Sequence, residues 1–288
     1  MMITNDWIAG FVDGDGCFNI EKRVTKKGVT TVRHRFIVSQ DKRSKDVLYA
    51  LKKVFQCGSV HKSGSNMFAF QIGDRESIKN KVIPFFKKNP LQTEKRKRFE
   101  LFAESVLNCR EEKSENLLPL LHSEKHPLHR EERESNPLAF SISDSWFAGF
   151  VDAEGCFSVS IVGNYPRPQL LIGVSQGEKA LLVALQAYLR CGRIRLRKDG
   201  FLIYQVSSTK DLQDHVFPKL FTRSGNPLLR TIKRISSQKF RKIVLLFLKK
   251  QHLTQPGLDK IVKLKANLNL ASTNSVVPVC REDQKESF

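Results

Sequence analysis

Two pairs of acidic residues in this sequence have the type and placement of metal ligands. The segment WIAGFVDGDGCF at residues 7–18 returns as WFAGFVDAEGCF at residues 146–157, and each copy carries its carboxylates near the end. If each copy forms a helix, the acids lie at the negative end of the helix dipole, where stability alone favours Lys or Arg. Carboxylate oxygens suit Mg²⁺, which keeps several waters and takes further ligands from phosphate. We therefore expect Asp15 and Glu154 to converge on a metal site, the alternative being solvated turn residues.

The repeated segment also predicts how the acids are brought together. Its aromatic and aliphatic residues recur at helical spacing in both copies. A glycine in the middle of each helix, Gly10 or Gly149, costs about 1 kcal/mol relative to Ala, and small residues let two helix backbones approach closely. We therefore expect the two helices to pack on each other across a pseudo-twofold axis. Both should end at glycines in the left-handed conformation, Gly16 and Gly155.

The internal similarity extends well beyond this segment. The sequence VSQ ends at Gln40 and again at Gln176, and CG recurs at Cys57 and Cys191 with nearly the same spacing between the copies. A spacing that drifts only slightly along the chain indicates a duplicated unit with loops of different length. Each unit reads as a helix, two strands, a helix, two strands and one or two further helices, an α+β domain with an antiparallel sheet. We expect an N-terminal domain at 1–109, a linker at 110–143, a C-terminal domain at 144–272 and a flexible tail at 273–288.

Alternation along the predicted strands separates a core face from a polar, mostly basic face. In RIRLR, Ile194 and Leu196 point to one side while the three arginines point to the other. An ordinary solvated face is the alternative, but arginines at alternate positions favour a sheet laid against nucleic acid, where Arg reads base edges. The residues expected on the two polar faces are Asn19, Glu21, Arg23, Arg33, Arg35, Ser59, His61, Ser63 and Gln71 in the first unit, and Ser158, Ser160, Arg193, Arg195, Arg197 and Gln205 in the second.

The charge of the chain supports a polyanionic partner. Lys and Arg number 49 against 29 Asp and Glu, a formal net charge of +20 over 288 residues. This charge favours nucleic acid over an anionic membrane, because no apolar run approaches the ~20 residues of a bilayer span. Six cysteines without a secretory signal fit a reducing compartment. A zinc site would need the second cysteine of a C-x-x-C pair, so we interpret as a polar linker the region that holds Cys109, His122, His126 and His129.

The segments IAGFVDGDG and FAGFVDAEG resemble the two motifs of single-chain homing endonucleases of the LAGLIDADG family, and the similarity covers the element order of both units. The C-terminal HLTQPGLDKIVKLKANLN is similar to the end of members from fungal mitochondrial introns. The resemblance implies two pseudo-symmetric αββαββα domains, each with a saddle-shaped antiparallel sheet, packed through the motif helices in a monomer. It also implies hydrolysis of one phosphodiester per strand of a long, asymmetric double-stranded DNA target, with short 3′ overhangs. The protein would act in a mitochondrion or chloroplast, encoded there without a transit peptide, or otherwise in the cytoplasm.

The same resemblance implies a metal site with named ligands. Asp15 and Glu154 would bind Mg²⁺, helped by the backbone carbonyl groups of Gly14 and Ala153. Mn²⁺ would substitute for Mg²⁺, and Ca²⁺ would support DNA binding without cleavage. The residues expected to make hydrogen bonds at the helix ends, rather than to bind metal, are Asp13 and Asp152.

Further catalytic positions follow from the resemblance. Gln40 and Gln176 would orient water in the active site, although polar strand ends are an equal interpretation of these residues. A basic residue after the NPL sequence would stabilise charge on the phosphate. Lys95 in NPLQTEK fits that position, whereas Lys233 in NPLLRTIK fits only with a one-residue insertion.

Two other functions are compatible with the same scaffold. A maturase binds its host intron RNA and assists splicing, and a transcription regulator uses the fold for DNA binding alone. Loss of a motif acid would favour either alternative, and both acids are present. The sequence therefore favours the nuclease, and binding of host intron RNA can coexist with cleavage.

Overall fold

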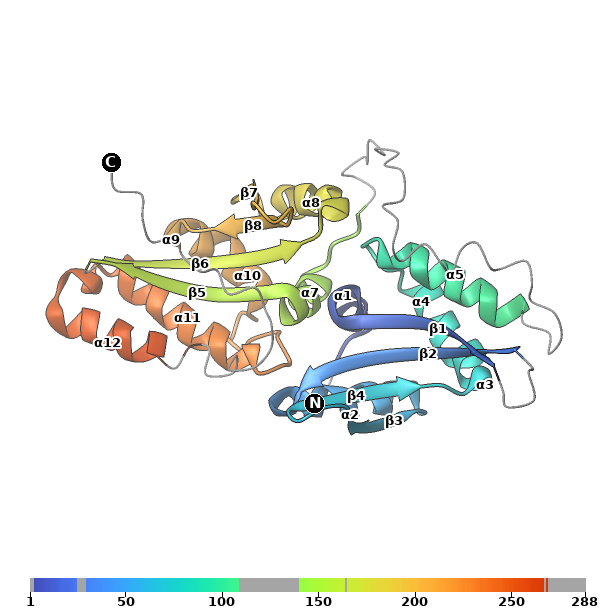
Figure 1. The fold of residues 1–288 in the computed structure, drawn as a ribbon. Helices are drawn as coiled ribbons and strands as arrows, with labels where there is room; N and C mark the ends of the chain where they lie inside the picture. The colour runs from blue at the N-terminus through green and yellow to red at the C-terminus, as the bar shows by residue number, and fades with distance from the viewer. Residues whose placement is uncertain (1–2, 25–29, 109–139, 164, 267, 269–288) are drawn as a thin grey trace.

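A computed structural model describes residues 3–24, 30–108, 140–163, 165–266 and 268 (Figure 1). Most of the predicted linker at 110–143 lies outside these ranges, as do the tail at 273–288 and the zinc candidates Cys109, His122, His126 and His129. None of the helices in this described part combines the length and the apolar character needed to cross a bilayer.

The first repeat has the predicted order of elements, with short helical turns added between them. The motif helix α1 (Asn5–Asp15) leads into β1 (Gly16–Val24), β2 (Thr30–Asp41), the 3-10 turn η1 (Lys42–Ser44) and α2 (Lys45–Phe55). The remaining elements are β3 (Ser59–Lys62), β4 (Met67–Ile72), α3 (Arg75–Ser77), the π-helical turn η2 (Ile78–Val82), α4 (Ile83–Lys88) and α5 (Lys95–Asn108).

The second repeat follows the same order and adds a helix at its end. The motif helix α7 (Asp144–Glu154) is followed by β5 (Gly155–Val162), β6 (Tyr165–Val174), the 3-10 turn η6 (Gln176–Glu178) and α8 (Lys179–Leu189). The remaining elements are β7 (Arg193–Leu196), β8 (Leu202–Val206), α9 (Thr209–Asp211), the π-helical turn η7 (Leu212–Val216), α10 (Phe217–Leu220), α11 (Lys233–Leu248), the 3-10 turn η8 (Gln251–Leu253) and α12 (Gln255–Ala266).

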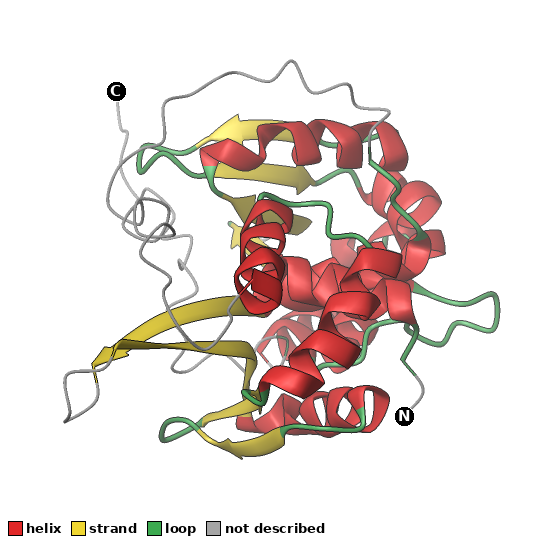
Figure 2. Ribbon diagram, turned by 90° about the vertical axis from the view of Figure 1, so that its right-hand side faces the viewer, coloured by secondary structure: helices red, strands yellow, loops and turns green. Residues whose placement is uncertain are grey.

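Each repeat builds one four-stranded antiparallel sheet, which confirms the predicted α+β class. The strand orders are β1-β2-β4-β3 and β5-β6-β8-β7. Phe36 on β2 and Leu170 on β6 are fully buried and belong to the core between each sheet and its helices. In Figure 2 the strands of both sheets reach toward the left of the view, while helices fill its centre and right. The two sheets therefore present one face to the helical core and one face away from it.

The register of the sheets corrects one equivalence between the repeats. Gln40 lies opposite Phe68 in the first sheet, and Val174 lies opposite Leu202 at the same point of the second. The separation along the chain from Gln40 to Val174 equals that from Phe68 to Leu202. The predicted match of Gln40 with Gln176 is therefore wrong by two residues, because β6 ends at Val174 and Gln176 already belongs to a 3-10 turn.

The motif helices α1 and α7 lie side by side at the centre of the molecule, with one repeat on each side (Figure 1). Their backbones are in direct contact at the predicted glycines. A Cβ atom on Gly10 would lie 2.0 Å from the carbonyl O of Trp146, and a Cβ atom on Gly149 would lie 2.1 Å from the carbonyl O of Trp7. No side chain fits into either position, which explains why both helices accept the cost of a central glycine.

The glycines that end the motif helices have a different role from the predicted one. Gly16 and Gly155 adopt extended conformations, with φ of −79° and −74°, so the left-handed cap was the wrong expectation. Each is the first residue of a strand that turns sharply away from its helix. A Cβ atom on Gly16 would lie 2.4 Å from Cγ1 of Val12, and one on Gly155 would lie 2.6 Å from Cγ1 of Val151. Close approach to the preceding turn, rather than a positive φ, therefore requires glycine.

Gly10→Ala and Gly149→Ala are expected to lower the free energy of unfolding by about 1 to 3 kcal/mol each, because the added methyl group has to push the two helices apart. The measurement is urea unfolding followed by circular dichroism. Gly173→Ala is the matched control, since a Cβ atom there meets nothing within 4 Å. Equal stability of all three variants would contradict direct backbone contact between the helices.

Candidate active site

The acids at the ends of α1 and α7 share one region because the helix ends meet there. Asp15 is the last residue of α1, and Glu154 is the last residue of α7. A Cβ atom on Gly14 would lie 2.2 Å from Cβ of Ala153 and 3.2 Å from Oε1 of Glu154. The backbone of one helix thus reaches the carboxylate of the other. Glycine at position 14 leaves the room that this carboxylate occupies.

Both carboxylates are costly to ionise in this environment. Burial raises the pKa of Asp15 and of Glu154, and repulsion from Asp15 raises the pKa of Glu154 further. The nearby ammonium groups of Lys233 and Lys95 lower both pKa values without offsetting the burial. A cation placed between two such carboxylates would relieve this cost, as is typical of functional acid pairs.

Lys95 and Lys233 bind the carbonyl groups that precede these acids. Nζ of Lys95 donates to the carbonyl O of Gly14 at 2.6 Å, and Nζ of Lys233 donates to the carbonyl O of Ala153 at 2.7 Å. Burial lowers the pKa of Lys95, while the nearby carboxylates raise it. The two carbonyl groups predicted to bind metal therefore already accept a hydrogen bond, and each keeps a second lone pair.

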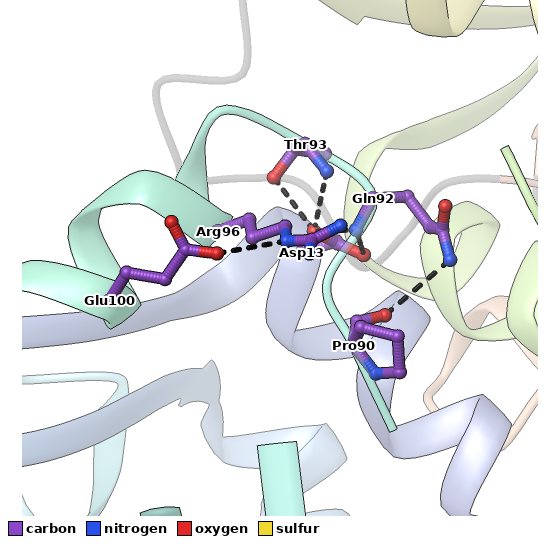
Figure 3. Close-up of polar contacts among 6 residues, drawn as sticks. All are labelled: Asp13, Pro90, Gln92, Thr93, Arg96 and Glu100. Atoms are coloured by element: carbon purple, nitrogen blue, oxygen red, sulfur yellow. Dashed lines mark hydrogen bonds and ion pairs between the residues drawn. The ribbon is translucent and has the colours of Figure 1, made fainter. Parts of the chain in front are cut away.

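Asp13 anchors the segment that carries Lys95. Its carboxylate accepts hydrogen bonds from the backbone N–H of Gln92 at 2.9 Å, the backbone N–H of Thr93 at 3.0 Å and the hydroxyl of Thr93 at 2.7 Å (Figure 3). Burial raises the pKa of Asp13, and these hydrogen bonds lower it. Its oxygens are occupied by protein donors, so Asp13 makes the helix-end hydrogen bonds expected from the sequence. Past this anchor, helix α5 continues with the exposed ion pair between Arg96 and Glu100 (Figure 3).

Asp152 anchors the second lysine segment in the same way. It accepts hydrogen bonds from the backbone N–H of Arg230 at 2.5 Å, the backbone N–H of Thr231 at 3.2 Å and the hydroxyl of Thr231 at 2.5 Å. Burial raises the pKa of Asp152 to about 6. Lys233 lies two residues after this threonine and is the first residue of α11, just as Lys95 follows Thr93 at the start of α5. The inserted residue after NPL is therefore absorbed before the anchor, and the two lysines are equivalent.

An indole from the opposite repeat completes each anchor. Nε1 of Trp7 donates to Oδ2 of Asp152 at 3.1 Å, and Nε1 of Trp146 donates to Oδ2 of Asp13 at 2.9 Å. Both tryptophans are only 2% exposed. Each lysine segment is thus held by an acid that is itself held by the other repeat.

The two acids at the site have different neighbours. Nε2 of Gln40 donates to Oδ2 of Asp15 at 2.5 Å. Val174 takes the place of Gln40 in the second sheet and has no polar atom in its side chain. Gln176 begins η6, and its side chain lies outside the described part of the chain. The structure therefore brings Gln40, but not its register equivalent, into the site as a polar group.

An open pocket of about 360 Å³ lies beside Glu154 and is lined by both repeats. Lys95 and Arg98 of α5 line it together with Glu154 of α7 and Ser175 and Glu178 of the second repeat. Basic and acidic side chains thus border the same solvent-accessible space.

The donor set fits a divalent metal that keeps much of its water. Across residues 3–24, 30–108, 140–163, 165–266 and 268, no group of three or more His, Cys, Asp or Glu side chains could hold a metal ion by itself. Asp15 and Glu154 supply two carboxylates with raised pKa values. Mg²⁺ is bound in proteins by one or two carboxylates, waters and substrate phosphate, whereas structural Zn²⁺ takes four protein ligands. The acid pair therefore suits Mg²⁺ or a similar hard cation.

The polar residues predicted on the first sheet lie on one face. Asn19 pairs with Arg35, and Glu21 pairs with Arg33, in positions that alternate with the buried Phe36. Arg35 donates to Glu21 at 2.7 Å, so this arginine is held in place by a neighbour on the same face. The register continues this face across β4 and β3 through Gln71, Ser59 and His61. Ser63 directly follows the end of β3. The backbone of Arg23 belongs to the same face on β1, but its side chain lies outside the described part.

The second sheet carries a connected polar face. Oε1 of Gln205 accepts hydrogen bonds from Arg195 at 3.2 Å and Arg193 at 3.4 Å, and Nε2 of Gln205 donates to Gln169. Ser158 lies opposite Gln169 in the register, and Ser160 continues the same face along β5. Two arginines are thus oriented by a glutamine that is itself mostly buried.

The end of β7 departs from the predicted alternation. Leu196 was expected on the core face but is 64% exposed, because it ends an edge strand that extends past the core. Arg197 follows the strand and pairs with Asp199 at 2.9 Å. The basic face of this repeat therefore rests on Arg193 and Arg195 within the strand.

Sequence reasoning missed Arg167 and Gln169 on β6, which share the polar face with Ser158 and Ser160. Prolines at 166 and 168 obscured the strand, because proline cannot donate to a sheet ladder. This part of β6 pairs with β5 alone, since pairing with β8 begins at Leu170. The constant spacing between the repeats, which matches Arg167 with Arg33, could have found both positions.

Comparison with known proteins agrees with this geometry. The chain matches the family described as LAGLIDADG endonuclease twice, over residues 8–106 and 147–244. It is 32% identical to a probable intron-encoded endonuclease, Cox1-I1b, of Schizosaccharomyces pombe over 57% of this chain and 47% of that protein. It is 31% identical to a probable intron-encoded DNA endonuclease of Mycosarcoma maydis over 75% of this chain and 91% of that protein. It is 26% identical to probable intron-encoded endonuclease 4 of Neurospora crassa over 93% of this chain and 45% of that protein. The chain therefore spans about half the length of the S. pombe and N. crassa relatives.

Solved structures share the fold over nearly the whole chain. I-SmaMI bound to an uncleaved DNA target in the presence of calcium ions has a TM-score of 0.78 at 25% identity, with 93% of this chain and 99% of that chain covered. The I-SmaMI homing endonuclease bound to cleaved DNA has a TM-score of 0.76 at 25% identity, with 93% and 97% covered. With two paired motif helices, two equivalent sheets and a family match in each repeat, this chain belongs to the LAGLIDADG endonuclease family.

Proposed function

We propose that this protein is a site-specific homing endonuclease that binds double-stranded DNA and hydrolyses one phosphodiester in each strand. The observation that carries the proposal is the meeting of Asp15 and Glu154 at the junction of two repeats whose sheets each present a polar face. Phosphate contacts position a duplex, and side chains on a sheet face read base edges. The structures of I-SmaMI with uncleaved and with cleaved DNA support a DNA substrate for this chain.

Each residue at the acid pair has a distinct role in this proposal. Asp15 and Glu154 would hold Mg²⁺, which would supply a Lewis acid to activate water and neutralise charge on the phosphodiester. Gln40 keeps the carboxylate of Asp15 in one orientation. Lys95 and Lys233 fix the carbonyl groups next to the acids and add positive charge where a scissile phosphate would lie.

The finer features of the reaction follow the same proposal. Mn²⁺ replaces Mg²⁺ in cleavage, while Ca²⁺ supports DNA binding without turnover, in line with I-SmaMI on an uncleaved target in the presence of calcium ions. Cleavage leaves short 3′ overhangs. The relatives named as intron-encoded endonucleases support an intron origin, and we place the activity in the mitochondrion or chloroplast that encodes the chain.

The polar faces of the two sheets carry different side chains, which predicts a DNA target without twofold symmetry. The first face carries Ser59 and His61 on its edge strand, where the second carries Arg193 and Arg195. Arginine reads guanine with two hydrogen bonds, whereas serine does not distinguish one base in this way. Each half of the protein therefore prefers a different half-site.

Neither binding-only alternative is favoured. A regulator or an RNA maturase has no need of two carboxylates whose pKa values are raised by burial, because ionising them weakens the fold for no gain. The retention of both acids, each with a lysine beside it, supports a nuclease.

Asp15→Asn and Glu154→Gln are expected to slow cleavage by at least about a hundredfold while leaving DNA affinity largely unchanged, because each removes metal-binding charge and neither side chain reads a base. The target comes from selection of cleaved duplexes in a random library with Mg²⁺. Single-turnover cleavage with Mg²⁺ and DNA titration with Ca²⁺ then measure the two properties. Asp46→Asn, which neutralises an exposed acid on α2, is the control, and cleavage by both active-site variants at the wild-type rate would remove the metal site.

Lys95→Met and Lys233→Met are expected to act on different strands, since each lysine binds the carbonyl group that precedes one of the two acids. Each variant should slow cleavage of one strand by about a hundredfold and of the other strand much less. A duplex with a different dye on each strand measures the two rates in one reaction. Lys53→Met removes an equal charge from the exposed face of α2 and should change neither rate; equal slowing of both strands by one active-site variant contradicts the assignment.

Arg195→Ala is expected to relax discrimination at a single base pair by about 1 to 3 kcal/mol if Arg195 reads a base edge. Affinities for a set of targets with single base-pair changes test this. Weakening of equal size across the whole set would instead assign Arg195 to a phosphate contact.

A further inference from the structure

Two polar side chains occupy the cap positions of their own helices but bind the start of a helix in the opposite repeat. Ser44 precedes α2, and Glu178 precedes α8; in the described structure neither side chain makes a capping hydrogen bond to its own helix. Oγ of Ser44 accepts from the backbone N–H of Ile232 at 3.1 Å. Oε1 of Glu178 accepts from the backbone N–H of Glu94 at 2.8 Å. Each repeat therefore supplies a hydrogen-bond acceptor to the start of a helix in the other repeat.

The two contacts are equivalent under the internal symmetry. Ser44 and Glu178 have the same separation along the chain as Gln40 and Val174, which are matched by the register of the preceding strands. Ile232 and Glu94 stand directly before the lysines that begin α11 and α5. The exchanged caps thus act at the residues that place these lysines.

The first N–H groups of a helix have no partner within the helix, so an acceptor there fixes the first turn. Thr93 and Thr231 accept the N–H of the two lysines, and the motif acids hold these threonines. Glu94 and Ile232 lie between these threonines and lysines, and their N–H groups would have no side-chain acceptor without Glu178 and Ser44 of the opposite repeat. Ser44 and Glu178 therefore complete the set of hydrogen bonds that orients each lysine.

We propose that Ser44 and Glu178 are positioning residues that couple the two half-sites, each fixing the lysine helix of the opposite repeat. The coupling itself is a property of the fold, and only its effect on cleavage rests on the proposed function. The two caps differ in chemistry, since a hydroxyl holds α11 and a carboxylate holds α5. The cap on the Lys95 helix therefore responds to pH, whereas the hydroxyl cap on the Lys233 helix carries no group that titrates.

The surroundings of Glu178 set the direction of this response. Burial raises the pKa of Glu178 to about 7; the carboxylates of Glu94 and Asp13 raise it as well, while the N–H of Glu94 and the ammonium of Lys95 lower it. Arg98 lines the same pocket. Above about pH 7 the ionised carboxylate makes a charge-assisted hydrogen bond to α5, and protonation at lower pH replaces it with a weaker neutral one. The cap on α5 therefore weakens as the pH falls through about 7.

Amide hydrogen exchange of the full, DNA-free chain tests the coupling without any need for cleavage. Ser44→Ala should raise exchange about fivefold at residues 232–235 and leave 94–97 unchanged, and Glu178→Ala should do the reverse. Glu178→Gln keeps an acceptor, so it should retain most of the protection at 94–97 and lose the dependence on pH between about pH 6 and pH 8, after correction for intrinsic exchange. Asp74→Ala is the control, because Asp74 caps Ser77 in its own segment.

Strand-specific cleavage then connects the coupling to activity. Glu178→Ala should slow the strand assigned to Lys95, and Ser44→Ala the strand assigned to Lys233, by about fivefold each. In the wild-type chain the ratio of the two strand rates should change between about pH 7 and pH 8, above the pKa of about 6 of Asp152, and Glu178→Gln should remove that change. Unaltered exchange at the start of the opposite helix in both alanine variants overturns the proposal. Altered exchange in a chain that cuts no DNA supports the coupling and rejects the nuclease function.

Discussion

Contact between two helix backbones is the constraint on which the rest of this structure depends. Because Gly10 and Gly149 face the carbonyl groups of the opposite helix, the backbones of α1 and α7 are in direct contact. At this distance each tryptophan reaches across and binds the acid of the other helix. Those acids hold the threonines before Lys95 and Lys233, and the lysines hold the carbonyl groups beside the carboxylates. The contact at the two glycines is therefore linked, through a series of hydrogen bonds, to the carbonyl groups beside Asp15 and Glu154.

On this symmetric framework the chemistry of the two halves differs. One half has an aspartate with Gln40 beside it, while the other has a glutamate with Val174 at the matching strand position. The framework residues are the same or similar in both repeats, whereas the edge strands of the two polar faces differ, with Ser59 and His61 in the first repeat and Arg193 and Arg195 in the second. This distribution suits a molecule that must hold one geometry and read two unlike half-sites.

The sequence predicted the framework well because duplication makes it visible twice. Helical spacing, central glycines and strand alternation are local patterns, and the structure confirms the paired helices, the element order and the polar faces. The hydrogen bonds of Asp13 with Thr93 and of Glu178 with Glu94 join residues far apart in the chain, so no local sequence pattern predicts them. The register error at Gln176 has a similar cause, because shared letters suggested an equivalence that only strand pairing could decide. Gly16 and Gly155 were assigned the commonest use of a glycine after a helix, while the actual requirement was space next to a valine.

The tryptophan–aspartate exchange has a consequence for how such proteins can be recombined. A repeat taken alone leaves its aspartate without an indole and its indole without a carboxylate, so it is not a self-sufficient module. Chimeras that join one repeat of this chain to a repeat of a relative therefore have to inherit both members of each pair, together with the small residues between them. The sheet faces can differ between the two parents of such a chimera, but the tryptophans and aspartates that pair between the repeats have to match.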